Sequence, residues 1–330
     1  MKLLFEALSG AEQILILTHN DPDPDAVAGA VALRYLLAEK AGLASVIGFQ
    51  GIIGRAENRA LTAYLGNPLN PLTDLELSEL AVVALVDTQP GAGNNTVPPN
   101  ATITVVIDHH PQCEASNQVK FADIRTDLGA TSTILTQYLQ AVGLEPNQQL
   151  ATALFYGIKT DTMGLSREAS PADAAAYFYL QPKIDTDALI EIERAQVPLD
   201  YFKMFDTALR SAHIYQDVII SYIGPMAYPD MVAEMADMLL RLEGSQWIIC
   251  MGTFNNSLVL SVRTRNREGG AGRLAQGIVG KEGVAGGHGT MAGGHIVLAG
   301  RNPKSVAGRL TRRALQHLNI PPNTKGQRLV

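Results

Sequence analysis

The sequence predicts an α/β protein, with a doubly wound, mostly parallel sheet followed by a smaller α/β C-terminal domain. Short apolar runs alternate with helical patterns through the first half of the chain, as they do in α/β folds. The runs are continuously apolar, which indicates strands that are covered on both faces. A second series of apolar runs starts after residue 213, which indicates a separate core.

The first half contains four strand candidates and four helical patterns. The strands are expected at Ile14–Thr18, Ala44–Phe49, Ala81–Val86 and Thr102–Ile107. The helices are expected at Ala26–Glu39, Asn58–Leu65, Gly129–Val142 and Asn147–Lys159.

The second half repeats this alternation on a smaller scale. Strands are expected at Asp217–Ile223, Gln246–Gly252, Ser257–Arg263 and Ile296–Ala299, and helices at Asp230–Leu242, Arg273–Val279 and Pro303–Leu318. Gly283–Gly294 reads as a glycine-rich loop. We therefore expect one domain over residues 1–185, a linker helix over 186–209 and a second domain over 210–330, with the functional site in the cleft between the domains.

The composition is that of an ordinary globular protein. The 330 residues are 46% hydrophobic and 18% charged, which is enough for two cores. Cys113 and Cys250 lie far apart in the sequence, which excludes a disulfide framework and favours a reducing, cytoplasmic setting. No apolar run reaches the ~18–20 residues that a membrane span needs, and Glu6 and Glu12 interrupt the N-terminus too early for a signal peptide.

Charge is divided unevenly along the chain. Residues 1–209 hold 12 Lys and Arg against 25 Asp and Glu, a net charge of −13, and residues 210–330 hold 14 against 7, a net charge of +7. The two values sum to the −6 of the whole chain. An acidic half suits metal ions and a basic half suits a phosphate-bearing ligand, although most of these charges are also expected on solvated faces.

The strongest local motif is His19-Asn-Asp-Pro-Asp23-Pro-Asp25. It follows a predicted strand and precedes a predicted helix, the position at which open α/β sheets bind ligands. Pro22 and Pro24 restrict the loop and hold the carboxylates apart. The motif could equally be a capping turn, with Asp25 as the N-cap of a helix that starts at Ala26.

Three further elements end in similar side chains. Asp87 ends one strand, Asp108-His109-His110 ends the next, and Asp161 follows a helical pattern. One such aspartate is usually a turn residue, but four elements that end in this way indicate a shared metal site. Mixed carboxylate and imidazole ligands suit Mn²⁺ better than Ca²⁺ or a structural zinc, and two such ions can share a bridging carboxylate and water.

These motifs, in this order, resemble the four motifs of the DHH phosphoesterase superfamily. Residues 286–293, Gly-Gly-His-Gly-Thr-Met-Ala-Gly, resemble the glycine–histidine loop of the DHH-associated domain. The resemblance covers essentially the whole chain. Three positions depart from the usual pattern, and none is a ligand: Pro24 replaces a common Gly, Ala30 a common Ser, and Ala285 a third Gly.

The resemblance implies a site with two divalent ions, Mn²⁺ first, with Mg²⁺ and Co²⁺ as alternatives. One ion would be held by His19, Asp23 and Asp87, and the other by Asp25, Asp87, His109 and Asp161, with Asp87 as the bridge. Asp108 would orient a histidine, and His110 would face the scissile phosphate and assist the leaving group. The nucleophile would be a metal-bridging hydroxide.

For the second domain the resemblance implies substrate anchors. These would be Arg263, Gly286, Gly287, His288 and Gly289, with Arg265 and Arg267 as further candidates. Thr131 and Ser132 open a predicted helix and offer either an anion site at its N-terminus or helix caps.

The predicted function is hydrolysis of phosphate esters in short oligonucleotides or nucleotides. The length resembles nanoRNase and 3′-phosphoadenosine 5′-phosphate phosphatase members, without the extra domain of long-DNA exonucleases. The alternatives are an inorganic pyrophosphatase and a non-catalytic nucleotide-binding regulatory protein. We expect a short nucleic-acid or nucleotide partner, no long duplex, no membrane association and, from the resemblance, a homodimer.

Overall fold

The structure is a computed structural model that describes residues 1–330 apart from residues 12, 76–81, 100 and 267, and apart from the side chains of Asp74 and His288. The chain divides into two units, Met1–Gln196 and Val197–Val330, and each is described by itself.

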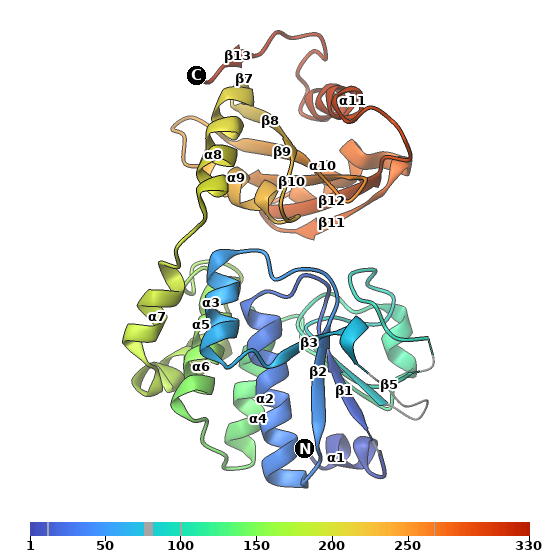
Figure 1. The fold of residues 1–330 in the computed structure, drawn as a ribbon, viewed down its shortest axis with the longest axis vertical. Helices are drawn as coiled ribbons and strands as arrows, with labels where there is room; N and C mark the ends of the chain where they lie inside the picture. Colours follow the sequence, from blue (N-terminus) through green and yellow to red (C-terminus); the bar gives the residue numbers. More distant parts are fainter. Residues whose placement is uncertain (12, 76–81, 100, 267) are drawn as a thin grey trace. The chain divides into compact units, whose positions relative to one another are not determined.

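The N-terminal unit is built on a six-stranded sheet in the order β3-β2-β1-β4-β5-β6 (Figure 1). All five strand pairs are parallel, which confirms the predicted fold class. From the central strands the chain proceeds outward in both directions, so β1 and β4 flank a topological switch point. The strands are β1 Ile14–Leu17, β2 Ser45–Phe49, β3 Leu69–Pro71, β4 Val82–Val86, β5 Thr102–Asp108 and β6 Phe121–Ile124.

Seven helices belong to this unit in the part of the chain that the structure describes. They are α1 Lys2–Leu8, α2 Pro24–Ala41, α3 Ala56–Tyr64, α4 Thr131–Ala141, α5 Gln148–Asp161, α6 Pro171–Leu180 and α7 Thr186–Glu193. Short 3₁₀ turns lie at Leu72–Asp74, Glu114–Gln118 and Gln181–Lys183. Ala81, the first residue of one predicted strand, lies outside the described residues.

Both faces of the sheet are buried, as the continuous apolarity predicted. On one face Ile14 and Ile16 pack into a large core with α2, α4 and α5. On the other face Leu15 and Leu17 belong to a smaller cluster, which connecting segments around Leu72 cover. Successive residues of β1 therefore alternate between two cores, because side chains in a strand point to opposite faces.

Helix α2 starts two residues earlier than the sequence predicted. Its N-cap is Asp23, whose carboxylate accepts hydrogen bonds from the amides of Asp25 and Ala26, and Pro24 occupies the first turn, where its missing N–H costs nothing. The alternative interpretation, with Asp25 as the N-cap, was therefore wrong about the residue, because Asp23 already caps the helix. At the other end Gly42, with φ 64°, terminates the helix in a left-handed conformation.

Residues 186–209 form two helices rather than one linker helix. Helix α7 ends at Glu193, and α8 (Leu199–Ser211) begins after Pro198. Proline disfavours helical geometry in the residue before it and cannot donate a backbone hydrogen bond, so a continuous helix is interrupted here. The boundary between the units lies in this interruption, after Gln196.

The C-terminal unit contains a seven-stranded mixed sheet in the order β11-β12-β10-β9-β8-β7-β13. Only β8 and β9 pair in parallel among the described strands. The strands are β7 His213–Tyr215, β8 Val218–Pro225, β9 Trp247–Phe254, β10 Ser257–Thr264, β11 Val284–His288, β12 Met291–Val297 and β13 Gln327–Arg328. The helices are α8, α9 Met231–Leu239, α10 Ala271–Val279 and α11 Pro303–His317, with a 3₁₀ turn at Gly280–Glu282.

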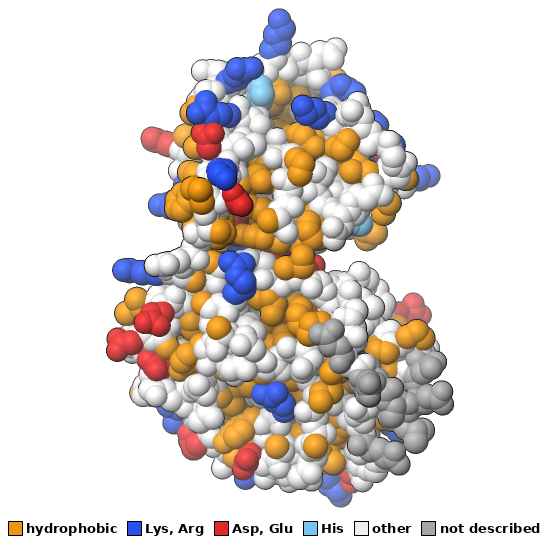
Figure 2. All heavy atoms as spheres, viewed as in Figure 1, with side chains coloured by type: hydrophobic (Ala, Val, Ile, Leu, Met, Phe, Trp, Pro, Cys, Tyr) orange, Lys and Arg blue, Asp and Glu red, His pale blue; other side chains and the backbone are white. Residues whose placement is uncertain are grey.

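This second sheet also separates two cores. Ile249 and Met251 of β9 face the cluster that contains α10 and α11, and Ile248 and Cys250 face the cluster that contains α8 and α9. On the face visible in Figure 2, Lys and Arg side chains outnumber acidic ones on this unit. None of the described helices is long and apolar enough to cross a membrane.

The predicted glycine-rich loop at Gly283–Gly294 is instead a β-hairpin. Strands β11 and β12 pair antiparallel, with Gly286 opposite Gly293. Glycines were read as loop residues because they are unfavourable in strands. Here Gly294 permits close packing, since a Cβ atom on it would lie 2.8 Å from Cγ2 of Val279 in α10.

Candidate metal centre

The carboxyl ends of three neighbouring strands supply most of the site. His19 follows β1, Asp87 follows β4 directly, and Asp108 is the last residue of β5. These strands lie side by side in the order β1-β4-β5, so the parallel topology brings their ends together. Asp161 joins them as the last residue of α5.

The first group of candidate ligands consists of His19, Asp23 and Asp87. One ligand atom from each lies within 4.8 Å of the others. Nε2 of His19 lies 3.7 Å from Oδ1 of Asp23 and 3.6 Å from Oδ2 of Asp87. The imidazole is oriented by Nδ1, which donates a 2.8 Å hydrogen bond to the Asn20 carbonyl and leaves Nε2 as the ligand atom.

The second group consists of Asp25, His109 and Asp161, again within 4.8 Å of one another. Nε2 of His109 lies 3.4 Å from Oδ2 of Asp161 and 3.5 Å from Oδ1 of Asp87. The two oxygens of Asp87 thus face different histidines, an arrangement that suits a bridging ligand. The bridging role itself stays a prediction.

One further observation indicates that these side chains suit a metal ion. Nε2 of His109 is buried and has no hydrogen-bond partner among the described residues. Its Nδ1 donates to the Leu128 carbonyl at 3.3 Å, so the neutral ring presents a lone pair at Nε2. A buried polar atom without a partner is costly, and a bound cation would satisfy it.

Backbone geometry also directs Asp87 into the site. Asp87 has φ 60°, a left-handed conformation that is uncommon for residues other than glycine, asparagine and aspartate. Its carboxylate is buried and accepts a 2.8 Å hydrogen bond from Oγ1 of Thr131. A strained conformation at a buried carboxylate is typical of functional positions.

The N-terminus of α4 binds a carboxylate of the chain itself. The amides of Thr131 and Ser132 donate hydrogen bonds of 2.7 and 2.8 Å to the two oxygens of Asp25. The N-cap position is Ala130, which has no capping side chain. Of the two options that the sequence left open, an anion site is therefore observed, and its anion is Asp25.

The protonation equilibria reflect a crowded cluster of acids. Burial raises the pKa of Asp161 to about 6, with the charge of Asp23 adding to the effect. Burial and the charge of Asp87 raise the pKa of Asp25 well above its usual value. Burial opposes protonation of His19, but the hydrogen bond and charge of Asp23 outweigh it and raise that pKa to about 10. Without cations the cluster therefore retains protons that metal ions would displace.

Asp108 does not belong to either three-residue group and instead orients His110. Its Oδ1 accepts a 2.9 Å hydrogen bond from Nδ1 of His110 and a 2.8 Å bond from the His109 amide. Asp87, His109 and His110 form a third set of closely placed ligand atoms. His110 therefore lies next to the candidate ligands. That it faces the scissile phosphate, as the resemblance implies, stays a prediction.

Two residues at the centre were missed by the sequence reasoning. Nε2 of Gln89 donates to Oδ2 of Asp108 at 2.8 Å, and its Oε1 accepts from the Cys113 amide and the Ser116 hydroxyl. Arg167 donates to the Asp161 carbonyl at 2.7 Å. Gln89 lies two residues after Asp87, which was a weak signal, and nothing in the sequence marked Arg167.

The candidate substrate anchors lie in the other unit. Arg263 on β10 is 8% exposed; its Nε bonds Oδ1 of Asp237 at 2.5 Å and its Nη1 bonds the Ser261 hydroxyl at 2.8 Å. Arg265 donates to the Leu240 carbonyl. Both guanidinium groups thus hold α9 and the turn after it against β10. Their role toward a substrate stays a prediction.

Of the glycines among the anchors, Gly287 is closely packed. Gly286 and Gly287 lie in β11, and Gly289 lies in the turn with φ 49°. Gly287 has φ 143°, and a Cβ atom there would lie 2.5 Å from Cα of Ala292. The side chain of His288 and all of Arg267 lie outside the described residues.

Comparison with known proteins identifies similarities along most of the chain. Residues 13–158 match the DHH family, N-terminal domain. The chain is 36% identical over 286 residues to the uncharacterized protein MJ1633 of Methanocaldococcus jannaschii, a match that covers 86% of this chain and 58% of that protein. It is 25% identical over 310 residues to the A-adding tRNA nucleotidyltransferase of Geobacter sulfurreducens, covering 90% of this chain and 34% of that enzyme.

The chain thus spans from about a third to less than two thirds of the length of these curated relatives. Among solved structures it is similar to an exopolyphosphatase-related protein from Bacteroides fragilis, with a TM-score of 0.68 and 15% identity over 96% of this chain and 95% of that chain. This similarity concerns the fold.

Proposed function

We propose that the protein is a metal-dependent phosphoesterase, a proposal supported by the match of residues 13–158 to the N-terminal domain of the DHH family. The observation that carries the proposal is the convergence of three histidines and four aspartates on one centre, from the segments that follow β1, β4 and β5, the start of α2 and the end of α5. Such a donor set suits divalent cations, which would neutralise the charge of an anionic substrate.

We assign two divalent cations to the two ligand groups. Four carboxylates, those of Asp23, Asp25, Asp87 and Asp161, balance the charge of two such ions. Mixed imidazole and carboxylate donors favour Mn²⁺, with Mg²⁺ and Co²⁺ as alternatives. Bound ions would neutralise phosphate oxygens and lower the pKa of a coordinated water.

The protein's own residues supply orientation and proton transfer. Asp108 holds His110 through Nδ1–H, so the proton exchanged with a leaving oxygen would reside on Nε2. Gln89 in turn fixes Asp108 through the 2.8 Å bond to its Oδ2. Asp108 and Gln89 therefore act as positioning residues, and His110 is the proposed catalytic acid.

We propose short oligonucleotides or nucleotides as substrates. The net charge of +7 over residues 210–330 supports a polyanionic ligand of modest length. The net charge of −13 over residues 1–209 disfavours tight binding of a long nucleic-acid backbone.

A substrate panel with metal-stripped, reconstituted protein tests this function. Mn²⁺, Mg²⁺ or Co²⁺ would be added with a 5-mer RNA, a linear di-adenylate, a cyclic di-adenylate, 3′-phosphoadenosine 5′-phosphate or pyrophosphate. We expect Mn²⁺-dependent release of nucleotide or phosphate, and loss of activity in His109→Ala. If only pyrophosphate is hydrolysed, the protein is an inorganic pyrophosphatase and the proposed substrate class is wrong. Binding of nucleotides without hydrolysis of any ester would contradict catalysis.

A further inference from the structure

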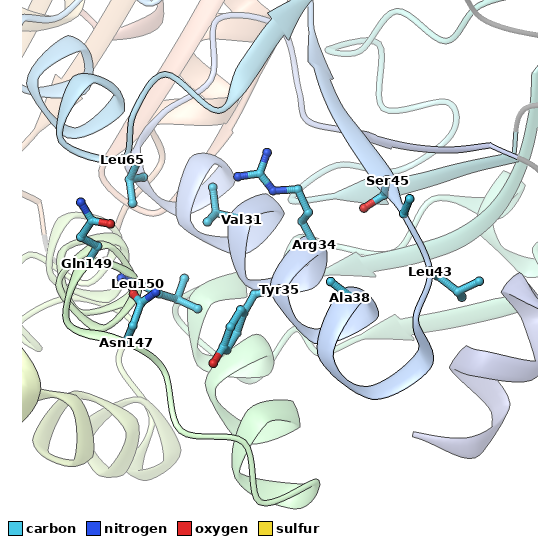
Figure 3. A pocket seen from close by; sticks show the side chains of 11 residues that line it. Val31, Arg34, Tyr35, Ala38, Leu43, Ser45, Leu65, Asn147, Gln149 and Leu150 are labelled. Atoms are coloured by element: carbon cyan, nitrogen blue, oxygen red, sulfur yellow. Dashed lines mark hydrogen bonds between the residues drawn. The ribbon is translucent and has the colours of Figure 1, made fainter.

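A pocket of about 430 Å³ lies in the N-terminal unit away from the metal centre (Figure 3). It is lined by the C-terminal half of α2, the start of β2, the end of α3 and the N-terminus of α5. Ser45 is the first residue of β2, so the pocket lies at the amino end of that strand, whereas the metal centre lies at the carboxyl ends. Along α2, Arg34 follows Asp25 by a rise of about 13 Å at ~1.5 Å per residue.

Arg34 is the distinctive residue of this pocket. It is the one charged side chain among the lining residues, and Figure 3 shows it extending from α2 between the apolar walls. Among the described residues its guanidinium makes a single hydrogen bond, from Nη1 to the Pro68 carbonyl at 3.5 Å, the outer limit of such a bond. A guanidinium offers five N–H donors, so most of its donor capacity is not used by these residues.

The charge of Arg34 is also uncompensated within the described part of the chain. Burial lowers the pKa of Arg34. Among the described residues, no carboxylate lies close enough to oppose this effect with its charge. Taking a charged group partly out of water without a partner is unfavourable, and an anion from outside would relieve that cost.

The remaining walls indicate what kind of anion would fit. Ser45 Oγ is shut off from solvent, so an anion in the pocket would not contact it. The two amide side chains of the lining already have partners. Gln149 donates to the Tyr64 carbonyl, and Asn147 accepts from the Leu150 amide. The rest of the lining is mainly apolar, as with Val31, Leu43 and Leu150.

We propose that this pocket binds a small organic anion, with Arg34 holding its carboxylate or phosphate group and the apolar walls holding its organic part. Carboxylates and phosphates both present two oxygens that a guanidinium can bind through two parallel hydrogen bonds. The volume lies within the ~300–1,000 Å³ typical of small-molecule sites. This site is independent of the phosphoesterase centre.

The full-length protein tests the proposal with three probes of similar size. Benzoate and phenyl phosphate carry the anionic group, and benzyl alcohol is the neutral control. We expect saturable binding of at least one anion by calorimetry or NMR titration. Arg34→Met, which retains the apolar stem, should weaken that binding at least about tenfold because a charge-assisted hydrogen bond is lost. Its melting temperature should remain close to wild type, since one long hydrogen bond is removed.

A second variant separates this site from the metal centre. Asp87→Asn should bind the anions as wild type does, whether or not the protein hydrolyses any ester. Loss of binding in Asp87→Asn would place the anions at the metal centre and overturn the proposal. Equal binding by Arg34→Met, equal binding of benzyl alcohol, or no saturable binding of either anion would also overturn it. A dimer that dissociates in Arg34→Met would identify an acidic segment of a second copy as the occupant instead.

Discussion

Thr131 bonds two carboxylates of the candidate metal centre at once. Its Oγ1 donates a 2.8 Å hydrogen bond to Oδ1 of Asp87, and its backbone amide donates a 2.7 Å bond to Oδ2 of Asp25. All three residues are buried, so these bonds rather than water fix the carboxylate orientations. One residue at the start of α4 thereby connects the ligands that follow β4 and open α2.

The Thr131 hydroxyl is expected to tune metal affinity. Thr131→Val keeps the shape and the backbone bond to Asp25 but removes the hydroxyl that orients Asp87, and loss of such a supporting bond typically costs ~10–100-fold in affinity. Thr131→Ser retains the hydroxyl and should bind Mn²⁺ within a few-fold of wild type. Calorimetric titration of metal-stripped protein measures both. Equal affinity in the Val and Ser variants would rule out the orienting role.

Asp87→Asn should abolish high-affinity metal binding and yet stabilise the metal-free protein. Asparagine tolerates the φ of 60° at this position, so the backbone should be unchanged. Burial raises the pKa of Asp87, so the ionised carboxylate destabilises the metal-free fold. This loss of stability grows as pH rises from the ordinary aspartate pKa through the raised folded pKa. The gain in melting temperature should therefore be larger at pH 8 than at pH 5. Thermal unfolding with and without a chelator measures it, and a lower melting temperature in the metal-free variant would contradict the expectation.

A charge cluster in the C-terminal unit should make stability depend on pH. Hydrogen bonds from Arg309 and Arg313 hold the pKa of Glu282 below its usual value, and Arg301 also pairs with it at 2.7 Å. An acid with a lowered pKa stabilises the fold above its unfolded pKa and loses this effect as pH falls through the folded pKa. Glu282→Gln should thus cost ~0.5–1 kcal/mol near neutral pH, a value reduced for partial exposure.

That difference should shrink as pH falls below the ordinary glutamate pKa and disappear below the lowered folded pKa, where Glu282 is protonated in both states. Denaturant unfolding at several pH values measures it, and added salt should narrow the gap near neutral pH. A difference that is constant with pH would mean that packing, not charge, is what the substitution disturbs.

Two glycines on helices of the C-terminal unit should respond in opposite directions to alanine. On Gly272 a Cβ atom would lie 2.1 Å from the Gly287 carbonyl oxygen, so Gly272→Ala must displace β11 and should cost ~1–3 kcal/mol. Gly308 in α11 has nothing within 4 Å of an added Cβ atom, and Gly308→Ala should stabilise by ~0.5–1 kcal/mol. Equilibrium unfolding compares them directly. Equal effects would show that the approach of α10 to Gly287 is not tight.

Much of the fold followed from apolar patterning alone. The runs that became β1, β4 and β5 are buried on both faces, so they carry a strong and unambiguous signal. The short strands β3, β6 and β13 were not predicted. Each has only two to four residues, which is too few to show the alternating pattern of a strand. The β11–β12 hairpin was read as a loop because glycine is unfavourable in strands, whereas Gly294 lies where a Cβ atom would come within 2.8 Å of Val279 in α10.

The candidate ligands could be named from the sequence because strand ends and chemistry coincide. His19, Asp87 and Asp108 each stand at the end of an apolar run, and parallel strands bring such ends to one edge. The partners that orient them could not be named. Thr131 reaches Asp87 over 44 positions and Asp25 over 106 positions of the chain, and no local pattern specifies contacts of that separation.

The sequence by itself determined the α/β class, the family motifs and the identity of the candidate metal ligands, because these depend on side-chain chemistry and short-range periodicity. The tertiary structure decided which oxygen of Asp87 faces which histidine, that the N-terminus of α4 binds Asp25, and that Arg34 lies in a pocket without a counter-charge among the described residues. These features arise from packing between elements that are distant in the chain, where distance and burial, rather than composition, set the interaction.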